Sequence, residues 1–160
     1  MKLSEYKEPV YQVIGAAMVV HGKLGRALLE PIYQEALALM LQMRGYASQR
    51  EVELKIYFMG IELQKRYKMD MVVENVIVEL KSVSRLLPAH RAQLCNYLRL
   101  TQKPIGLLIN FGEHRLIAER WVYDREADEC YLVDKSLNRV PKEQSFGLLN
   151  EEFQEQTQSQ

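Results

Sequence analysis

Three residues in one short stretch of the chain carry side chains suited to phosphodiester hydrolysis. Asp70 is followed, after eight intervening residues, by a Glu-x-Lys sequence that contains Glu79 and Lys81. The two carboxylates are hard oxygen ligands of the kind that Mg²⁺ or Mn²⁺ prefers, and a lysine can orient a water or stabilise charge that develops on a phosphate. Taken alone, the pattern is also common as an ion pair on a surface hairpin, so the surrounding elements must decide between the two readings.

The stretch around these residues predicts a tight β-hairpin. Two strands, over about 61–73 and 76–81, meet at Glu74-Asn75, where Asn tolerates a positive φ. A two-residue turn places Asp70 opposite Glu79, with Lys81 on the same face. Facing carboxylates repel, and an apolar hairpin that holds them needs a compensating cation, which a divalent metal would supply. We therefore expect a central hairpin whose opposite face is apolar, formed by Met69, Met71, Val73, Val76, Val78 and Leu80.

The helix expected after this hairpin adds three polar residues on one face. Gln93 and Tyr97 stand four residues apart, and His90 lies three residues before Gln93. A Q-x-x-x-Y helix after a D…E-x-K hairpin resembles the RecB-like branch of the PD-(D/E)xK nuclease superfamily. More closely, the chain resembles the small bacterial GxxExxY proteins assigned to that superfamily. The resemblance covers about residues 10–122 and five ordered blocks, LLEPIYQEAL at 28–37, Gln49, YKMDMVVENVIVELKSV at 67–83, HRAQLCNYL at 90–98 and GLLINFG at 106–112.

The resemblance implies a restriction-endonuclease-like α/β core and a role for each matching residue. Glu30 matches the acidic residue that an N-terminal helix contributes to the metal site, beside Asp70 and Glu79 as metal ligands and Lys81 as the catalytic cation. Gln93 and Tyr97 match a helix motif that organises the site and contacts nucleic acid, and we expect His90 to support the site beside them. The motif that names the family begins with Gly, whereas this chain has Ala27 there, which removes a residue suited to a positive φ before the helix.

Hydrophobic periodicity predicts a mixed α/β domain with the order α-α-β-β-β-α-β-β, a central sheet flanked by helices. The expected helices cover about 5–20, 28–44 and 88–100. The expected strands cover about 47–58, 61–73, 76–81, 104–111 and 115–123, and the last of them is expected to close the sheet. We place the nuclease-like domain at 1–123 and describe 124–160 as an acidic, partly disordered C-terminal extension, because residues 150–160 are nearly all Glu, Gln, Ser and Thr.

Composition narrows the class of protein further. The chain has 160 residues and a net charge of zero, but residues 1–122 carry 17 basic and 12 acidic side chains, whereas 123–160 carry 4 and 9. Two cysteines, Cys95 and Cys130, are too few for a disulfide framework and lack zinc spacing, so a reducing cytoplasm fits best. No segment has the length of a membrane span, and no P-loop or Ser/His/Asp motif appears.

The hypothesis from the sequence is therefore a Mg²⁺- or Mn²⁺-dependent nuclease that acts on nucleic acid, most simply DNA. The basic residues of the proposed site region suit a phosphate backbone, and a homodimer would make double-strand cleavage easiest. The alternative is a catalytically silent nuclease-fold module that binds nucleic acid or a protein partner, because a fold does not fix a function.

Overall fold

The computed structural model describes residues 2–141 and the backbone of 145–147, and the tail expected at 150–160 lies outside the described residues. The described residues contain the three expected α-helices, α1 (Lys7–Leu24), α2 (Glu30–Met43) and α3 (Pro88–Thr101), with a 3-10 turn, η1 (Leu3–Tyr6), before α1. Proline lies in the first turn of α2 and of α3, where its missing N–H costs no hydrogen bond.

The strands form one seven-stranded mixed sheet with the order β1-β4-β5-β6-β7-β8-β9, plus a two-stranded sheet of β2 and β3. Only the β5–β6 pair is parallel among the described strands, and α3 provides the crossover between them, whereas the other pairs are antiparallel. The bounds are β1 (Gln49–Leu54), β2 (Tyr57–Phe58), β3 (Ile61–Glu62), β4 (Tyr67–Val73), β5 (Val76–Lys81), β6 (Ile105–Asn110), β7 (Ile117–Asp124), β8 (Glu129–Val133) and β9 (Ser145–Gly147). The predicted mixed sheet flanked by helices is therefore confirmed.

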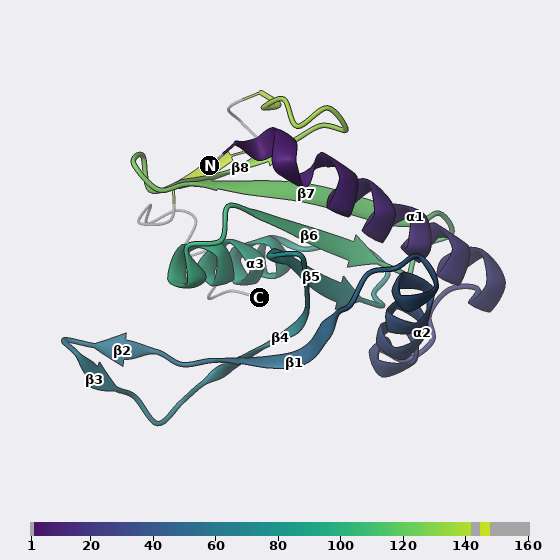
Figure 1. The fold of residues 1–160 in the computed structure, drawn as a ribbon, viewed down its shortest axis with the longest axis horizontal. Coiled ribbons are helices and arrows are strands. Elements are labelled where there is room, and N and C mark those ends of the chain that lie inside the picture. Colours follow the sequence, from purple (N-terminus) through teal and green to yellow (C-terminus); the bar gives the residue numbers. More distant parts are fainter. Residues whose placement is uncertain (1, 142–144, 148–160) are drawn as a thin grey trace.

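Two hydrophobic cores lie on the two faces of this sheet (Figure 1). Alternate residues of β6 show the division, because Leu107 belongs to the cluster that contains α1 and α2, whereas Leu108 belongs to the cluster that contains α3. The expected face of the β4–β5 hairpin is confirmed except at one position. Met71 packs with α1 and α2, but Met69 packs with α3, so the alternation shifts by one residue at Asp70.

The physical reason for this shift is an irregularity shared by two paired strands. In β1, Glu51 has a φ of 51°, a conformation that a non-glycine residue rarely adopts. The ladder between β1 and β4 pairs Arg50 with Met71 and Val52 with Met69, and it leaves Glu51 and Asp70 without a regular pairing. A local break of this kind bends a ribbon and redirects side chains, and such breaks are frequent next to active sites.

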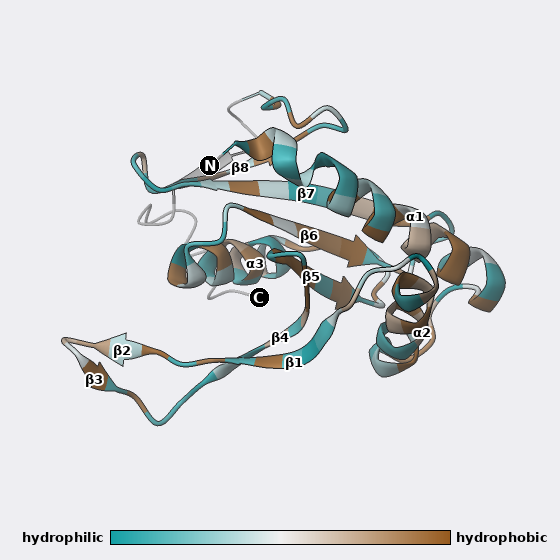
Figure 2. Cartoon of the chain, in the orientation of Figure 1, coloured by the Kyte–Doolittle hydropathy of each residue, from teal (hydrophilic) through white to brown (hydrophobic). Residues whose placement is uncertain are grey.

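Beyond this break, β1 and β4 run outward and end in the small β2–β3 hairpin (Figure 1). We call residues 55–66 the arm. Figure 2 shows hydrophobic colour on β3, at the end of the arm. Phe58, Met59 and Ile61 are 63%, 85% and 68% exposed. The sequence predicted continuous strands over 47–58 and 61–73, but each is interrupted between the sheet and the arm.

Two further strands follow residue 123, where we expected the sheet to close. β8 and β9 continue the sheet beyond β7, so the expectation of a last strand at 115–123 was wrong. Cys130 of β8 forms a disulfide with Cys95 of α3, with the two Cα atoms 5.9 Å apart and both side chains fully buried. The cysteine count did not predict this bond, which ties α3 to a strand outside the stretch that resembles the nuclease proteins.

The loop before α2 is held by a buried tyrosine. Tyr33 donates a hydrogen bond to the carbonyl of Gly25 at 2.6 Å, accepts one from the N–H of Leu28 at 3.0 Å, and stacks on Phe111 with ring centroids 4.3 Å apart. Ala27 in this loop has a φ of 64°. The position where the resembling family has Gly therefore requires a positive φ, and this chain accommodates it with Ala.

Candidate active site

The site begins where the backbone pairing of β4 with β5 ends. The register pairs Val73 with Val76 and Met71 with Val78, as a two-residue turn at Glu74-Asn75 predicts, and both turn residues have positive φ. This hairpin lies inside the sheet, between β1 and β6. The prediction of a central hairpin is therefore confirmed.

Immediately after the last backbone pair, two carboxylates replace the ladder. The N–H of Asp70 donates to Oε1 of Glu79 at 2.9 Å, and the N–H of Leu80 donates to Oδ2 of Asp70 at 2.8 Å. Each acid therefore bonds to the strand of the other, and the structure brings Asp70 and Glu79 together as the sequence predicted. Because the side chains occupy the bonding positions, the two strands do not pair there through their backbones.

The electrostatics of the pair favour a proton or a cation. Glu79 is only 2% exposed, and burial together with the neighbouring charge of Asp70 raises its pKa well above the usual range of a carboxyl. Burial is also the main reason that the pKa of Asp70 is raised, although the hydrogen bond from Leu80 opposes this shift. A buried carboxylate facing a half-buried one is destabilising unless positive charge compensates the pair.

Lys81 and the two motif residues of α3 lie around this pair. Nζ of Lys81 donates to Oε1 of Gln93 at 3.2 Å, and the lysine charge lowers the pKa of both carboxyls. The hydroxyl of Tyr97 lies 3.4 Å from the carbonyl of Lys68 in β4, and burial followed by the charges of Glu79 and Asp70 raises the pKa of this tyrosine well above its usual range. The α3 face predicted from the spacing of Gln93 and Tyr97 therefore faces the hairpin.

His90 combines a structural contact with a position near the site. Its Nδ1 accepts a hydrogen bond from the N–H of Leu87 at 2.9 Å and so satisfies one free donor at the start of α3. Burial and the nearby charges of Lys81 and Arg91 lower its pKa, which favours the neutral ring that this acceptor role requires. Arg91 anchors the same end of α3 through two hydrogen bonds of 2.9 and 2.8 Å to Glu119 of β7.

Helix α2 contributes a polar residue that the sequence analysis did not single out, in addition to Glu30. Glu30 is the first residue of α2 and is half-buried, and among the described residues its carboxylate forms no hydrogen bond or ion pair. Instead Gln34, one turn later and 5% exposed, points its Nε2 between the carbonyl of Asp70 at 3.1 Å and Oε1 of Glu51 at 3.3 Å. The structure thus links Gln34 and Glu51 to Asp70, whereas no hydrogen bond or ion pair among the described residues joins Glu30 to the pair, and its role as a metal ligand stays a prediction.

Sequence reasoning missed Gln34 and Glu51 for different reasons. Gln34 lies within the block that carried the resemblance, and its spacing from Glu30 places both residues on one helix face, which was a usable signal. Glu51 looked like a solvent-facing residue of an alternating strand, and only its positive φ turns it toward Gln34. The charge of Glu51 contributes to the raised pKa of Asp70.

Within residues 2–141, no group of three or more His, Cys, Asp or Glu side chains is arranged as a metal cluster. A cavity of about 470 Å³ lies along α2. Of the residues that line it, only Arg50 bonds to a residue of the site, which is Gln34. Arg50 donates through Nε to Oε1 of Gln34 at 3.1 Å, and this bond orients the amide so that its Nε2 faces Asp70.

The loop between β5 and α3 is fastened by a fully buried amide. Asn110, at the end of β6, accepts from the N–H of Val83 at 3.0 Å and donates to its carbonyl at 2.9 Å. A Cβ on Gly112 would overlap the carbonyl oxygen of Val83, so glycine is required at that close approach. These contacts fix the backbone directly after Lys81.

Comparison with known families agrees with this geometry. A family model described as the PD-(D/E)XK nuclease superfamily matches residues 7–121, and the chain belongs to this superfamily. Nucleases of this superfamily are usually enzymes that use divalent metal ions, commonly Mg²⁺. No curated protein and no solved structure matched the chain. In the part of the chain that the structure describes, no helix has the length and apolar character needed to cross a membrane.

Proposed function

We propose that this protein is a metal-dependent nuclease that hydrolyses phosphodiester bonds in DNA, of the GxxExxY type within the RecB-like branch. The observation that carries the proposal is the facing pair of half-buried Asp70 and buried Glu79, which is maintained beside Lys81 although it lacks a neutralising salt bridge among the described residues. Natural selection for stability alone would favour an apolar or cation-paired alternative.

The residues present fit a divalent ion. Asp70 and Glu79 offer hard oxygen donors, and the raised pKa of each carboxyl reflects an environment in which positive charge is favoured. Mg²⁺ or Mn²⁺ held by these two carboxylates would polarise a phosphate and acidify a water. Two residues are candidates for a third carboxylate ligand. Glu51 is linked to Asp70 through Gln34, which bonds to both residues, whereas Glu30 is the residue that the family resemblance implies.

The remaining residues would position the scissile phosphate and the proposed metal ligands and would polarise the phosphate. Lys81 would place its ammonium against a scissile phosphate, and its bond to Gln93 limits the directions in which it can point. Gln93 and Tyr97 would fix the spacing between α3 and the hairpin and contact nucleic acid, with His90 supporting the start of the helix. Gln34 would hold the backbone of Asp70, because it bonds to the carbonyl of that residue.

The direct test is cleavage of supercoiled, linear duplex and single-stranded DNA, and of RNA, with Mg²⁺, Mn²⁺ or EDTA. We expect metal-dependent cleavage by the wild type and a loss of at least about 10³-fold in Asp70→Asn and in Lys81→Met. Asn retains an oxygen that can accept the N–H of Leu80, so the first variant removes charge and preserves the hydrogen bond. Glu62→Gln, in the arm, is the matched control and should cleave like the wild type.

Absence of cleavage by any preparation, or equal cleavage by the variants, would contradict the catalytic proposal. The chain would then be a nuclease-fold module that binds without cutting. Retained affinity for DNA or for a protein partner would reveal this binding.

The third carboxylate can be identified separately. Glu51→Gln and Glu30→Gln remove one charge each from the two candidate positions, and metal affinity can be measured from the metal-dependent rise in melting temperature. The variant with the larger loss of affinity identifies the additional ligand. If both variants bind the metal as tightly as the wild type, neither Glu51 nor Glu30 is a ligand, and Asp70 and Glu79 bind the ion without them.

A further inference from the structure

A second cavity lies on the opposite side of the sheet from α3. It has a volume of about 280 Å³ and is enclosed by α1, the residue that follows α2, β7 and the segment after β8. This cavity shares no residue with the Asp70–Glu79 site, and it lies on the α1 side of the sheet. Its lining residues are Lys7, Val10, Tyr11, Ile14, Gly15, Met18, Arg44, Arg120, Lys135 and Leu137.

The charge of this cavity is entirely of one sign. Four of its lining residues are basic and none is acidic. Arg120 is half-buried on β7, and within residues 2–141 its guanidinium has no hydrogen bond or ion pair. The acid whose charge acts on Arg120 is Asp134, and its carboxylate already accepts the N–H groups of Ser136 and Asn138 at 2.9 and 3.0 Å.

Burial lowers the pKa of Arg120, and the charge of Asp134 opposes this shift only in part. Taking a guanidinium out of water without a partner is costly, and folded proteins normally pair such a group. An anion in the cavity would supply the missing partner.

Arg44 is held so that it faces the same space. Its Nη1 donates to Oε1 of Gln12 at 3.2 Å, and the guanidinium crosses α1 at Gly15, where an added Cβ would lie 2.8 Å from that nitrogen. Because Gln12 is neutral, this contact orients the guanidinium without neutralising it. Two arginines from different elements therefore present forked donors to one enclosure, the geometry that suits phosphate, sulfonate or carboxylate groups.

The floor of the cavity is apolar. Val10 and Leu137 are 2% and 9% exposed, and Ile14, which also lines the cavity, is half-buried. Tyr11 and Met18, which are 70% and 61% exposed, lie at the open side of α1. A bare inorganic ion would satisfy the cations but would leave this apolar surface in water, so an occupant with both an anionic head and an apolar body fits better.

We propose that this cavity is a binding site for a small organic anion with a planar or apolar body, whose anionic group pairs with Arg120 and Arg44. Lys7 and Lys135 add charge at the rim and increase the rate and strength of capture. The bound molecule connects α1 to β7 and to the segment after β8, and so it stabilises the fold by mass action. This binding is independent of the nuclease site.

The test uses anilinonaphthalenesulfonate, an organic anion of this class, and the uncharged N-phenylnaphthylamine, which has the same rings without the sulfonate. Fluorescence titration of the full chain should show one sulfonate site, with a Kd at least about tenfold tighter than that of the uncharged compound. Arg120→Met should weaken sulfonate binding by at least about tenfold, and Arg44→Met should weaken it several-fold. Arg125→Met removes an exposed arginine outside the cavity and should leave the Kd within about twofold.

Thermal melting provides a second readout. Without any ligand, Arg120→Met should melt at a higher temperature than the wild type, because it removes a desolvated charge that lacks a partner. The sulfonate should raise the melting temperature of the wild type and of Arg125→Met, but not that of Arg120→Met. Equal Kd values for the charged and uncharged compounds, or equal losses in Arg120→Met and Arg125→Met, would overturn the proposal.

Discussion

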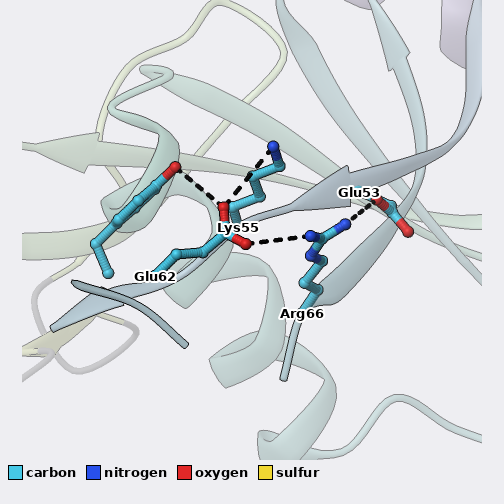
Figure 3. A network of polar contacts seen from close by, with 5 residues as sticks. Glu53, Lys55, Glu62 and Arg66 are labelled. Carbon is cyan, nitrogen blue, oxygen red and sulfur yellow. Dashed lines mark hydrogen bonds and ion pairs between the residues drawn. The ribbon is translucent and has the colours of Figure 1, made fainter. Parts of the chain in front are cut away.

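At the outer end of the β1–β4 ribbon, Arg66 donates hydrogen bonds to Glu53 and Glu62, at 2.9 and 3.1 Å (Figure 3). Lys55 forms a further ion pair with Glu62, with Nζ 3.8 Å from Oε1. At the inner end of the same ribbon, Asp70 faces Glu79 in the interior and no cation forms a salt bridge with either acid within residues 2–141. The exposed acids are paired with cations, whereas half-buried Asp70 and buried Glu79 are not, which reverses the arrangement expected if stability alone decided.

The pKa values of the two regions shift in opposite directions for this reason. The hydrogen bond from Arg66 is the main cause that lowers the pKa of Glu62, whereas burial and the charge of Asp70 raise that of Glu79. Glu62 is therefore favoured in its charged form and is already paired with Arg66, whereas burial disfavours the charged forms of Asp70 and Glu79, which form no salt bridge among the described residues. This difference separates carboxylates that hold a structure together from carboxylates that are available to bind a metal ion.

The largest expected effect is that of Glu79→Gln. We expect cleavage of DNA to fall by at least about 10³-fold, because the variant removes one of the two proposed metal ligands. Its stability in EDTA at pH 8 should increase by about 1–3 kcal/mol, because the buried charge is lost while an oxygen remains to accept the N–H of Asp70. Cleavage assays and chemical denaturation measure the two quantities.

Glu62→Gln is the matched change in the arm and should show the opposite pattern, with normal cleavage and a slightly lower melting temperature. If Glu79→Gln instead destabilises the metal-free protein, the buried pair contributes to folding and the contrast between the two regions fails.

The next largest effect concerns the helix that covers the interior pair. The disulfide between Cys95 and Cys130 closes a loop with a sequence separation of 35 residues. Removing it by Cys130→Ser should lower the free energy of unfolding by about 3–4 kcal/mol in the chain-entropy treatment. Because α3 carries Gln93 and Tyr97, cleavage should also become more sensitive to temperature. Melting with and without a reductant measures the stability, and the reductant should leave the melting temperature of Cys130→Ser unchanged.

The pH dependence of stability should also separate the two regions. The folded pKa of Glu79 is raised above its unfolded value, so its contribution is fully present below about pH 4.5 and is lost as pH rises through the folded pKa. The metal-free wild type should therefore lose stability relative to Glu79→Gln as pH rises from about 4.5, by at most about 1.4 kcal/mol per pH unit. Melting temperatures of both proteins in EDTA across this range measure the difference.

His90 acts in the opposite sense, because its lowered pKa reduces stability as pH falls below about 6.5. The comparison between wild type and Glu79→Gln cancels this contribution, since both proteins retain His90. Parallel curves for the two proteins would show that Glu79 titrates normally. Added Mg²⁺ should flatten the wild-type curve, because the ion replaces the proton on the pair.

The sequence predicted the parts of the site that depend on local chemistry. The turn at Glu74-Asn75 set the register that brings Asp70 to Glu79, and helical spacing set the face of α3. It could not predict Glu51, because a positive φ in the middle of a strand arises from tertiary contacts with Gln34 and not from the pattern of neighbouring residues. Alternation alone likewise placed Met69 on the wrong face.

The fold was predicted as far as strong periodicity reached. The pattern of residues 1–122 gave the helices and the central strands, but β8 and β9 are short, and the side chains of β8 do not alternate clearly between buried and exposed. The position of β8 depends on pairing with β7 and on the disulfide of Cys130, and β9 in turn pairs with β8. Local propensity carries little information about such contacts.

The smallest expected effect is that of Arg66→Met. This change removes the cation shared by Glu53 and Glu62, both exposed, and exposed ion pairs contribute little to stability because solvent screens them. The melting temperature should fall slightly at low salt and not measurably at high salt, since the Debye length is only about 3 Å at 1 M ionic strength. Cleavage of a short duplex should remain within about twofold of wild type, because arm contacts do not reach the interior pair. A large loss of stability that salt does not reduce would show that the ion pairs of Glu53 and Glu62 are shielded from solvent. It would remove the distinction between these paired carboxylates and the pair of Asp70 and Glu79 that we propose to bind metal.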